Sequence, residues 1–213
     1  SKRCGLASTL RGWCIRREMP PVVRAGDLVP SGGLEIARMV FSKSVLEASI
    51  GMAAINSLLD VDLEKCVEIN ASRILAEKGA GKRIAVIGNF PFLSKLKEHA
   101  DQLWIFERQA TAERGEFSED EMPNLLPKAD VVAISATTLI NHTLDSILPL
   151  LRPDSFKMML GPSTPLSPVL FEYGFNVLSG AMIVDIPQAL KDIGQGATNR
   201  QIRGTRRVSI SKL

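Results

Sequence analysis

Small polar side chains follow the predicted strands in the second half of the sequence, and their hydroxyl, amide and carboxylate groups suit the binding of a small polar ligand. The carboxyl ends of parallel strands meet along one edge of a sheet, and ligands bind at that edge. The recurrence of polar clusters at these ends therefore predicts a ligand site there. The candidate residues are Gly88, Asn89, Phe90, Glu107, Thr138, Asn141, Gly161, Ser163 and Gly180.

The stretch of residues 83–92, RIAVIGNFPF, contains the first of these strand ends. Its apolar and mostly β-branched run, IAVI, is typical of a strand buried on both faces of a parallel sheet. Gly88 ends the strand, and Pro91 suits the first turn of a helix. We interpret the segment after the strand as a binding loop, with a plain strand-to-helix turn as the alternative. Asn89, Phe90 and Pro91 replace the glycines of a G-x-G-x-x-G fingerprint or a P-loop, which disfavours an ordinary dinucleotide mode.

Glu107 is the principal carboxylate of the predicted site. It follows a predicted strand at residues 103–106 and lies about 20 residues after Gly88. Dinucleotide folds place at this interval an acid that accepts hydrogen bonds from ribose hydroxyls. We expect Glu107 to act as an acid/base or as a metal or ligand contact. The alternative is a structural carboxylate paired with Arg83, Arg108 or a nearby lysine.

Residues 44–60, SVLEASIGMAAINSLLD, predict a long helix with an apolar stripe. Ser44 and Glu47 have the spacing of a capping box, in which each side chain bonds to the backbone amide of the other residue. We expect Glu47, Ser49 and Asn56 to face a cleft, with Glu47 as a second acid/base candidate. The alternative is that Glu47 only caps the helix and that Ser49 and Asn56 are solvated.

The same helix carries small residues that form a thin surface, namely Ala48, Gly51, Ala53 and Ala54. Such a face lets a second backbone approach closely. We therefore expect the protein to form a homodimer through this helix.

The remaining sequence alternates predicted strands and helices, which is the pattern of an α/β fold with a doubly wound, mostly parallel sheet. Further strands are predicted at residues 131–135, 156–160, 176–178, 182–185 and 207–210, and helices at 34–41, 71–78, 91–100, 143–151 and 187–193. We also expect a strand at residues 3–10, a helix start at Ser163-Thr164, and a polar loop over residues 109–128. The acidic side chains of that loop indicate either a mobile lid or a solvated segment.

Composition indicates an ordinary globular protein of 213 residues, 45% hydrophobic and 23% charged. The formal net charge of +3 is too small to indicate nucleic-acid binding, and no apolar run approaches the ~18 residues that a membrane helix needs.

The three cysteines, Cys4, Cys14 and Cys66, are odd in number and lack a C-x-x-C spacing. We therefore expect reduced thiols, no intramolecular disulfide and a cytoplasmic location. The basic C-terminal tail indicates either a solvated segment or an anion-binding edge.

Four motifs together resemble a bacterial and archaeal family of unknown function labelled putative heavy-metal chelation. The motifs are EASIGMAAINSLL, GNFPF, TTLIN and LGPSTPLSPVLFEYGFNVLSG, and the match runs from about Gly5 to Gly196. The resemblance implies a small α+β domain similar to the enolase N-terminal domain at residues 1–69, followed by a Rossmann-like domain at residues 70–213. Family members carry further residues before the Gly5 region, so we expect the first domain to be incomplete in this chain, which starts at Ser1 without a methionine.

The resemblance also implies a site between the two domains. Glu47, Ser49 and Asn56 of the first would there meet Asn89, Phe90, Glu107, Thr138, Asn141 and Ser163 of the second. These hydroxyls, amides and carboxylates are hard ligands that suit a divalent metal such as Mg²⁺, or a polar organic molecule, better than a soft heavy metal.

Our leading hypothesis is a protein that binds a small polar or anionic ligand, a metal or a metal chelate in this cleft, with or without catalysis. One alternative is a non-catalytic heavy-metal chelation or chaperone module. A second alternative is a nucleotide-binding regulatory domain.

Overall fold

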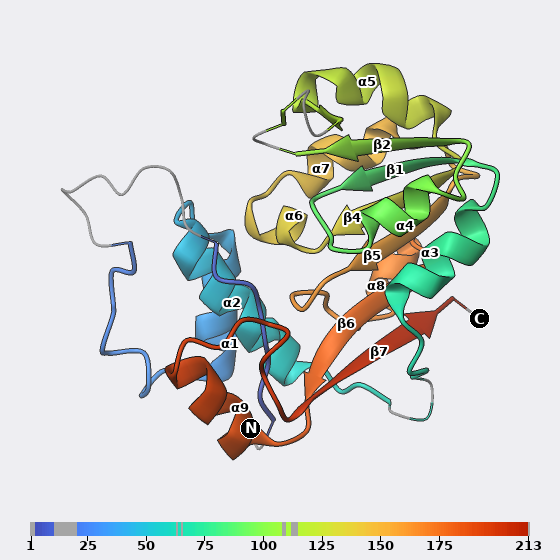
Figure 1. Ribbon diagram of the computed structural model, residues 1–213. Helices are drawn as coiled ribbons and strands as arrows, with labels where there is room; N and C mark the ends of the chain where they lie inside the picture. Colours follow the sequence, from blue (N-terminus) through green and yellow to red (C-terminus); the bar gives the residue numbers. More distant parts are fainter. Residues whose placement is uncertain are drawn as a thin grey trace.

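A seven-stranded β-sheet forms the centre of the computed structural model, which describes residues 3–10, 21–62, 64, 66–107, 110–111 and 115–212 (Figure 1). The strands are β1 (Arg83–Ile87), β2 (Gln102–Phe106), β3 (Glu116–Phe117), β4 (Val131–Ser135), β5 (Phe156–Leu160), β6 (Val177–Ile183) and β7 (Thr205–Ser211). They lie in the order β3-β2-β1-β4-β5-β6-β7. Neighbouring strands from β3 to β6 are parallel, and β7 is antiparallel to β6.

The chain changes direction across the sheet after β3. The strands β1 to β3 proceed toward one edge, and β4 then returns to the other side of β1. Ile87 consequently lies opposite both Phe106 of β2 and Ile134 of β4. Strands β1 and β4 form the topological switch point, where an open α/β sheet leaves a crevice beyond its strand ends. The predicted fold class, α/β with a doubly wound and mostly parallel sheet, is confirmed.

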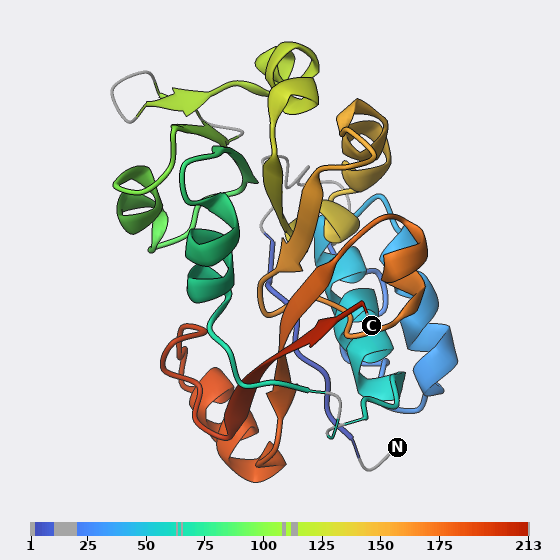
Figure 2. The ribbon, with the colours of Figure 1, turned by 90° about the vertical axis from the view of Figure 1, so that its right-hand side faces the viewer.

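Helices cover both faces of this sheet, as Figure 2 shows. On one face, Ile84 and Val86 pack against α3 and α4, and on the other face Ala85 and Ile87 join a cluster that includes residues of α5, α7 and α8. Successive strand residues point to opposite faces, so a strand that is covered on both sides must be apolar throughout. The helices of this part are α3 (Ala71–Gly79), α4 (Leu93–Lys97), η4 (Glu119–Glu121), α5 (Met122–Leu125), η5 (Leu126–Lys128), α6 (Thr137–Ile140), α7 (Leu144–Ile147), η6 (Leu148–Leu150), α8 (Val169–Glu172) and α9 (Ile186–Gly194).

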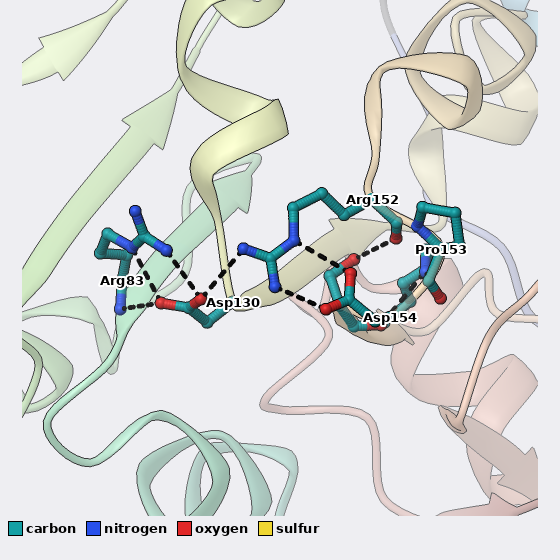
Figure 3. Close-up of polar contacts among 7 residues, drawn as sticks. Arg83, Asp130, Arg152, Pro153 and Asp154 are labelled. Carbon is teal, nitrogen blue, oxygen red and sulfur yellow. Dashed lines mark hydrogen bonds and ion pairs between the residues drawn. The ribbon is translucent and has the colours of Figure 1, made fainter.

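An ion-pair network joins the amino ends of β1, β4 and β5 (Figure 3). Asp130 accepts hydrogen bonds from the Arg83 Nε and Nη2 atoms, each at 2.9 Å, and from the Arg83 backbone amide at 3.1 Å. Arg152 contacts Asp130 at 3.4 Å and binds Asp154 with two hydrogen bonds of 3.0 and 2.8 Å. The hydrogen bonds from Arg83 hold the pKa of the Asp130 carboxyl well below its usual range. The network therefore holds together the amino ends of these strands, whereas the predicted ligand site lies at their carboxyl ends.

The N-terminal part consists of α1 (Gly33–Ala37), η1 (Arg38–Phe41) and α2 (Val45–Leu58), together with a segment at residues 3–10 that we call the strap. Figure 1 shows α1 and α2 on the same side of the molecule as α6 and the arrowheads of β1 and β2. The strand predicted at residues 3–10 is wrong, because the strap lies along α2 and does not pair with the sheet. No strand occurs among the described residues before position 60, so only the helical half of the α+β expectation is seen there.

The small residues of α2 contact the chain's own backbone. A Cβ atom on Gly5 of the strap would overlap the Ala53 carbonyl oxygen and the Ser57 amide, and one on Gly51 would overlap the Val40 amide. The thin face of α2 is thus already filled, and it no longer supports the predicted dimer.

Three further local predictions need correction. Residues 109–128 are not a continuous loop in the described positions, because β3 and the helices η4, α5 and η5 lie there. The strands predicted at 176–178 and 182–185 are one strand, β6, because all seven of its residues pair with β7. Ser163 and Thr164 do not start a helix, since α8 begins only at Val169.

Candidate functional site

A cavity of about 600 Å³ lies at the switch point, beyond the carboxyl ends of β1, β2 and β4. We call it the switch-point cavity. Its volume is within the range of small-molecule sites in proteins. Strand ends and the helices that follow them form most of the wall. The lining residues are Leu10, Val45, Ile87, Gly88, Phe106, Glu107, Glu119, Met122, Pro123, Ser135, Thr137, Thr138, Asn141, Thr143, Ser146, Ile147 and Leu150.

Gly88 forms the cavity wall at the end of β1 and could not be replaced without strain. Its φ angle of 108° lies in a region that residues with a Cβ atom rarely adopt. An added Cβ would also lie 2.9 Å from the Ser135 Cβ atom of the neighbouring strand. The Gly88 amide donates to the Phe106 carbonyl oxygen at 3.0 Å, which holds the turn against the end of β2. This glycine therefore lets the ends of three strands approach one another.

Glu107 lines the cavity directly after β2. Its backbone amide donates to the Phe117 carbonyl oxygen at 3.3 Å, which fixes the residue beside β3. The carboxylate has no hydrogen-bond or ion-pair partner among the residues that the structure describes. Pairing with Arg83, one predicted alternative, does not occur, because Arg83 binds Asp130 at the opposite edge of the sheet. Arg108, the other named partner, lies outside the described residues.

The hydroxyl and amide groups of the opposite wall are held in place by one another. The Ser135 and Thr137 hydroxyl oxygens are 2.8 Å apart, and the Thr138 hydroxyl donates to the Ser135 carbonyl oxygen at 2.7 Å. The Asn141 Oδ1 atom accepts from the Thr143 hydroxyl at 2.7 Å and from the Thr143 amide at 3.2 Å. These bonds orient the Asn141 side chain and leave its Nδ2 hydrogens to be donated to a ligand. The wall is therefore prearranged to donate and accept hydrogen bonds.

The N-terminal part closes the cavity on one side through Leu10 of the strap and Val45 of α2. Ser49 contributes indirectly, because its hydroxyl oxygen accepts from the Leu10 amide at 3.3 Å and its hydroxyl donates to the Val45 carbonyl oxygen at 2.7 Å. Ser49 thus positions Leu10 and Val45, which line the cavity, although Ser49 itself does not line it. Ser49 is buried, which rules out the solvated alternative for this residue.

Asn56 and Ser163 form a clamp between the N-terminal part and the sheet, away from the switch-point cavity. The Asn56 Nδ2 atom donates to the Leu6 carbonyl oxygen at 2.9 Å and to the Ser163 carbonyl oxygen at 3.2 Å. The buried Ser163 hydroxyl oxygen accepts from the Ser8 amide at 2.8 Å. These contacts join the strap, α2 and the segment after β5. They engage the Asn56 Nδ2 donor and both Ser163 oxygens within the protein, whereas the buried Asn56 Oδ1 atom has no hydrogen-bond partner among the described residues.

The other candidate residues lie outside the cavity lining. The Glu47 carboxylate accepts from the Val23 amide at 3.0 Å and from the Ser42 hydroxyl at 2.5 Å, so only the Ser44 half of the predicted capping box exists. The Asn89 amide donates to Glu116 at 3.4 Å. Phe90 stacks on Phe92 with ring centroids 5.5 Å apart. Gly161, with a φ angle of 119°, donates its amide to the Ser179 carbonyl oxygen, and Gly180 packs against Thr164 and Leu166.

Several lining residues were not singled out from the sequence. Ser135 is the last residue of its strand, whereas polar site residues were expected only after each strand. Met122 and Pro123 were hidden in the acidic stretch that was interpreted as a loop, although the sequence MPNLL within that stretch has the apolar residues of a buried helix.

The described residues fit a soft heavy metal poorly. No group of three or more His, Cys, Asp or Glu side chains among them could hold a metal ion. Cys4 lies on the strap and Cys66 near Asp62, and burial raises the pKa of both thiols, so the thiolate form that soft metals require is disfavoured. Cys14 lies outside the described residues. The oxygen atoms around the switch-point cavity suit a hard divalent ion or an organic ligand.

Among the described helices, none is long and apolar enough to cross a membrane.

Comparisons with known proteins agree with this architecture. A family model, DUF364, described as "Putative heavy-metal chelation", matches residues 70–212, and a second model with the same description, DUF4213, matches residues 1–59. An uncharacterized protein from Methanocaldococcus jannaschii is 31% identical over 163 residues, which cover 73% of this chain and 62% of that protein. The chain thus spans less than two thirds of the length of this curated relative.

Two solved structures of proteins with unknown function from the DUF364 family are similar to this chain. The structure from Desulfitobacterium hafniense has a TM-score of 0.78 and 28% identity, and the match covers 87% of this chain and 77% of that one. The structure from Pyrococcus horikoshii has a TM-score of 0.72 and 25% identity, and the match covers 84% of this chain and 75% of that one.

Proposed function

The chain belongs to the DUF364 family, described as putative heavy-metal chelation, and from this premise we propose that it binds a small polar ligand in the switch-point cavity. One observation carries the proposal. The cavity gathers the Asn141 amide and the Glu107 carboxylate, which has no partner among the described residues, at the ends of different strands, where open α/β sheets bind ligands. Glu107 would accept hydrogen bonds from hydroxyl or amine groups, and Asn141 would donate to a carbonyl or hydroxyl oxygen. Glu107 also stays our candidate for an acid/base, if the bound ligand reacts.

Closure of the cavity by the N-terminal part supports a site shared by two domains. We propose domains at residues 1–69 and 70–213, with Leu10 and Val45 of the first domain facing Gly88 and Glu107 of the second. Removal of the ligand from water would then depend on the strap, which is held by the clamp between Asn56 and Ser163.

The family description is compatible with this proposal if a metal is bound as part of a chelate. A polar organic chelator presents oxygen and nitrogen atoms, which the hydroxyl, amide and carboxylate groups of the cavity can recognise. A hard divalent ion such as Mg²⁺ could bind Glu107 with the chelator. A bare soft metal has no matching ligand set among the described residues.

A variant that blocks the cavity tests the proposal even while the ligand is unidentified. Ser146 lines the cavity from the exposed side of α7, so Ser146→Trp adds an indole there and leaves the core unchanged. The matched control is Ser94→Trp on the exposed side of α4. Both variants and the unmodified protein would be melted with a library of sugars, nucleosides, pterins, nucleotides, chelators and divalent metals.

A compound at about 100 times its Kd should raise Tm by about 5 °C or more, because binding then adds about 2.7 kcal/mol of stability. We expect such a shift in the unmodified protein and in the Ser94 variant, and none in the Ser146 variant. A shift that persists in Ser146→Trp would place the ligand elsewhere. A shift with a soft metal alone would favour the chaperone alternative.

The homodimer and the cytoplasmic location remain proposals. Light scattering at high micromolar concentration measures the molecular mass in solution and so distinguishes a homodimer from a monomer. Fractionation of cells that express the chain measures the second.

A further inference from the structure

Resting on the proposed function, we infer that the switch-point cavity takes a ribonucleoside, whose ribose 2′,3′-diol binds the Glu107 carboxylate, and that the bound molecule carries no pyrophosphate. Glu107 directly follows β2, and Ile87 of the adjacent strand β1 lies opposite Phe106. In dinucleotide-binding sheets, an acid at this position accepts hydrogen bonds from ribose hydroxyls. A carboxylate has two oxygens, and a vicinal diol supplies two donors at matching separation.

The wall around Glu107 suits the rest of a nucleoside. Met122 and Pro123 line the cavity from α5, and Ile147 and Leu150 line it from α7 and η6. These apolar side chains provide contact surface for the flat faces of a base. Asn141 and the paired hydroxyls of Ser135 and Thr137 provide the polar groups that a base edge or the ribose needs.

The loop after β1 is built against a pyrophosphate. Dinucleotide folds bind that group with a glycine-rich turn and the free amides at the start of a long helix. Here Phe90 and Phe92 stack in the turn, and Pro91 between them has no amide hydrogen. Helix α4 starts only at Leu93 and has five residues, and the Leu93 amide already donates to the Phe90 carbonyl oxygen at 3.2 Å. Pro91 thus removes one amide from this turn, and the Gly88 and Leu93 amides are already bonded to backbone carbonyl oxygens, so the turn lacks the row of glycine amides that binds a pyrophosphate.

Isothermal titration with chosen probes tests both halves of the inference. Adenosine, guanosine, cytidine and uridine would be titrated first, followed by the 2′,3′-dideoxy form of the one that binds best, its 5′-diphosphate, and NAD⁺. We expect the dideoxy form to bind at least tenfold more weakly, because hydrogen bonds to a charged group are lost. We also expect neither the diphosphate nor NAD⁺ to bind more tightly than the nucleoside. Dideoxy binding within threefold, or tighter binding of the pyrophosphate compounds, would refute the inference.

Matched carboxylate variants complete the test. Glu107→Gln should weaken binding of the best nucleoside at least tenfold, and Glu98→Gln, at an exposed position just after α4, should leave it unchanged. A melting curve establishes that each variant is folded. If no nucleoside binds while another library compound is lost in Ser146→Trp, the nucleoside inference fails and the proposed function stands. If Ser146→Trp affects no compound, the proposed function fails as well.

Discussion

Substitution of Asp130 by Asn should weaken the fold and leave the ligand site unaltered. Asp130 accepts three hydrogen bonds from Arg83 and one longer bond from Arg152 at the amino edge of the sheet (Figure 3). The Asn side chain keeps one oxygen, which can retain the two hydrogen bonds made at one of the two carboxylate oxygens of Asp130. Its amide group would point N–H donors at a guanidinium, which has no acceptor.

The expected loss of unfolding free energy is about 2 kcal/mol. A hydrogen bond to a charged group contributes about 1.5–3 kcal/mol, and two of the four hydrogen bonds at Asp130 are lost, whichever carboxylate position the Asn oxygen takes. The side chains of Asp130, Arg83 and Arg152 are 26%, 36% and 34% exposed, so solvent screening reduces this sum by about half. Urea unfolding of the two proteins at pH 7 measures the difference.

The pH dependence of that difference identifies its cause. Because the folded-state pKa of Asp130 is lowered, mainly by the hydrogen bonds from Arg83, its stabilising contribution is fully present above the unfolded-state pKa of about 3.9. The contribution is lost as the pH falls from that value toward the lower folded-state pKa. The difference between the two proteins should therefore be constant from pH 8 to pH 5 and should shrink below about pH 4. A difference below about 0.5 kcal/mol at pH 7, or one that grows in acid, would refute this account.

Three further outcomes follow from other contacts. Gly5→Ala should cost about 3 kcal/mol in urea unfolding, because the added methyl group collides with the α2 backbone and separates the strap from its hydrogen-bond partners; a cost below about 1 kcal/mol would contradict that packing. Glu107→Gln should change stability by less than about 1 kcal/mol, since the carboxylate has no partner among the described residues, whereas a loss above ~2 kcal/mol would assign it a structural role. Burial raises the pKa of the Cys4 and Cys66 thiols, so iodoacetamide at pH 7 should alkylate both more slowly in the folded than in the urea-unfolded protein, and equal rates would count against their burial.

The strands of the sheet were predictable because burial on both faces leaves a continuous apolar run. The predictions at 131–135 and 156–160 coincide with β4 and β5, and the edge strand predicted at 207–210 lies within β7. Segments stabilised by distant contacts were not predictable in this way. The two-residue strand β3 exists because it pairs with the end of β2, and the acidic charges around it concealed the apolar face of α5.

The grouping of candidate residues was partly visible in the sequence. Gly88, Glu107, Thr138 and Asn141 come from different strand ends and line one cavity, because parallel strands place those ends along one edge. The partners of Ser49, Asn56 and Ser163 were not visible, because these side chains bond to backbone atoms of the strap that are far away in sequence. Whether the cavity binds a ligand stays a prediction.

Strand β7 pairs with Val67 on one side and with β6 on the other, and its late position in the sequence has a consequence for how this protein is synthesised. The Val67 amide donates to the Ser209 carbonyl oxygen at 2.9 Å, and the Ser209 amide donates to the Val67 carbonyl oxygen at 2.8 Å. The Ser209 hydroxyl donates to the carbonyl oxygen of Ile69, which lies 140 positions earlier in the sequence. Strand β7 also covers the outer edge of β6, and it is translated after β1 to β6. Until then that edge exposes unpaired backbone groups, which other chains can pair with. The newly made sheet therefore depends on β7 to end the exposure of this edge to aggregation.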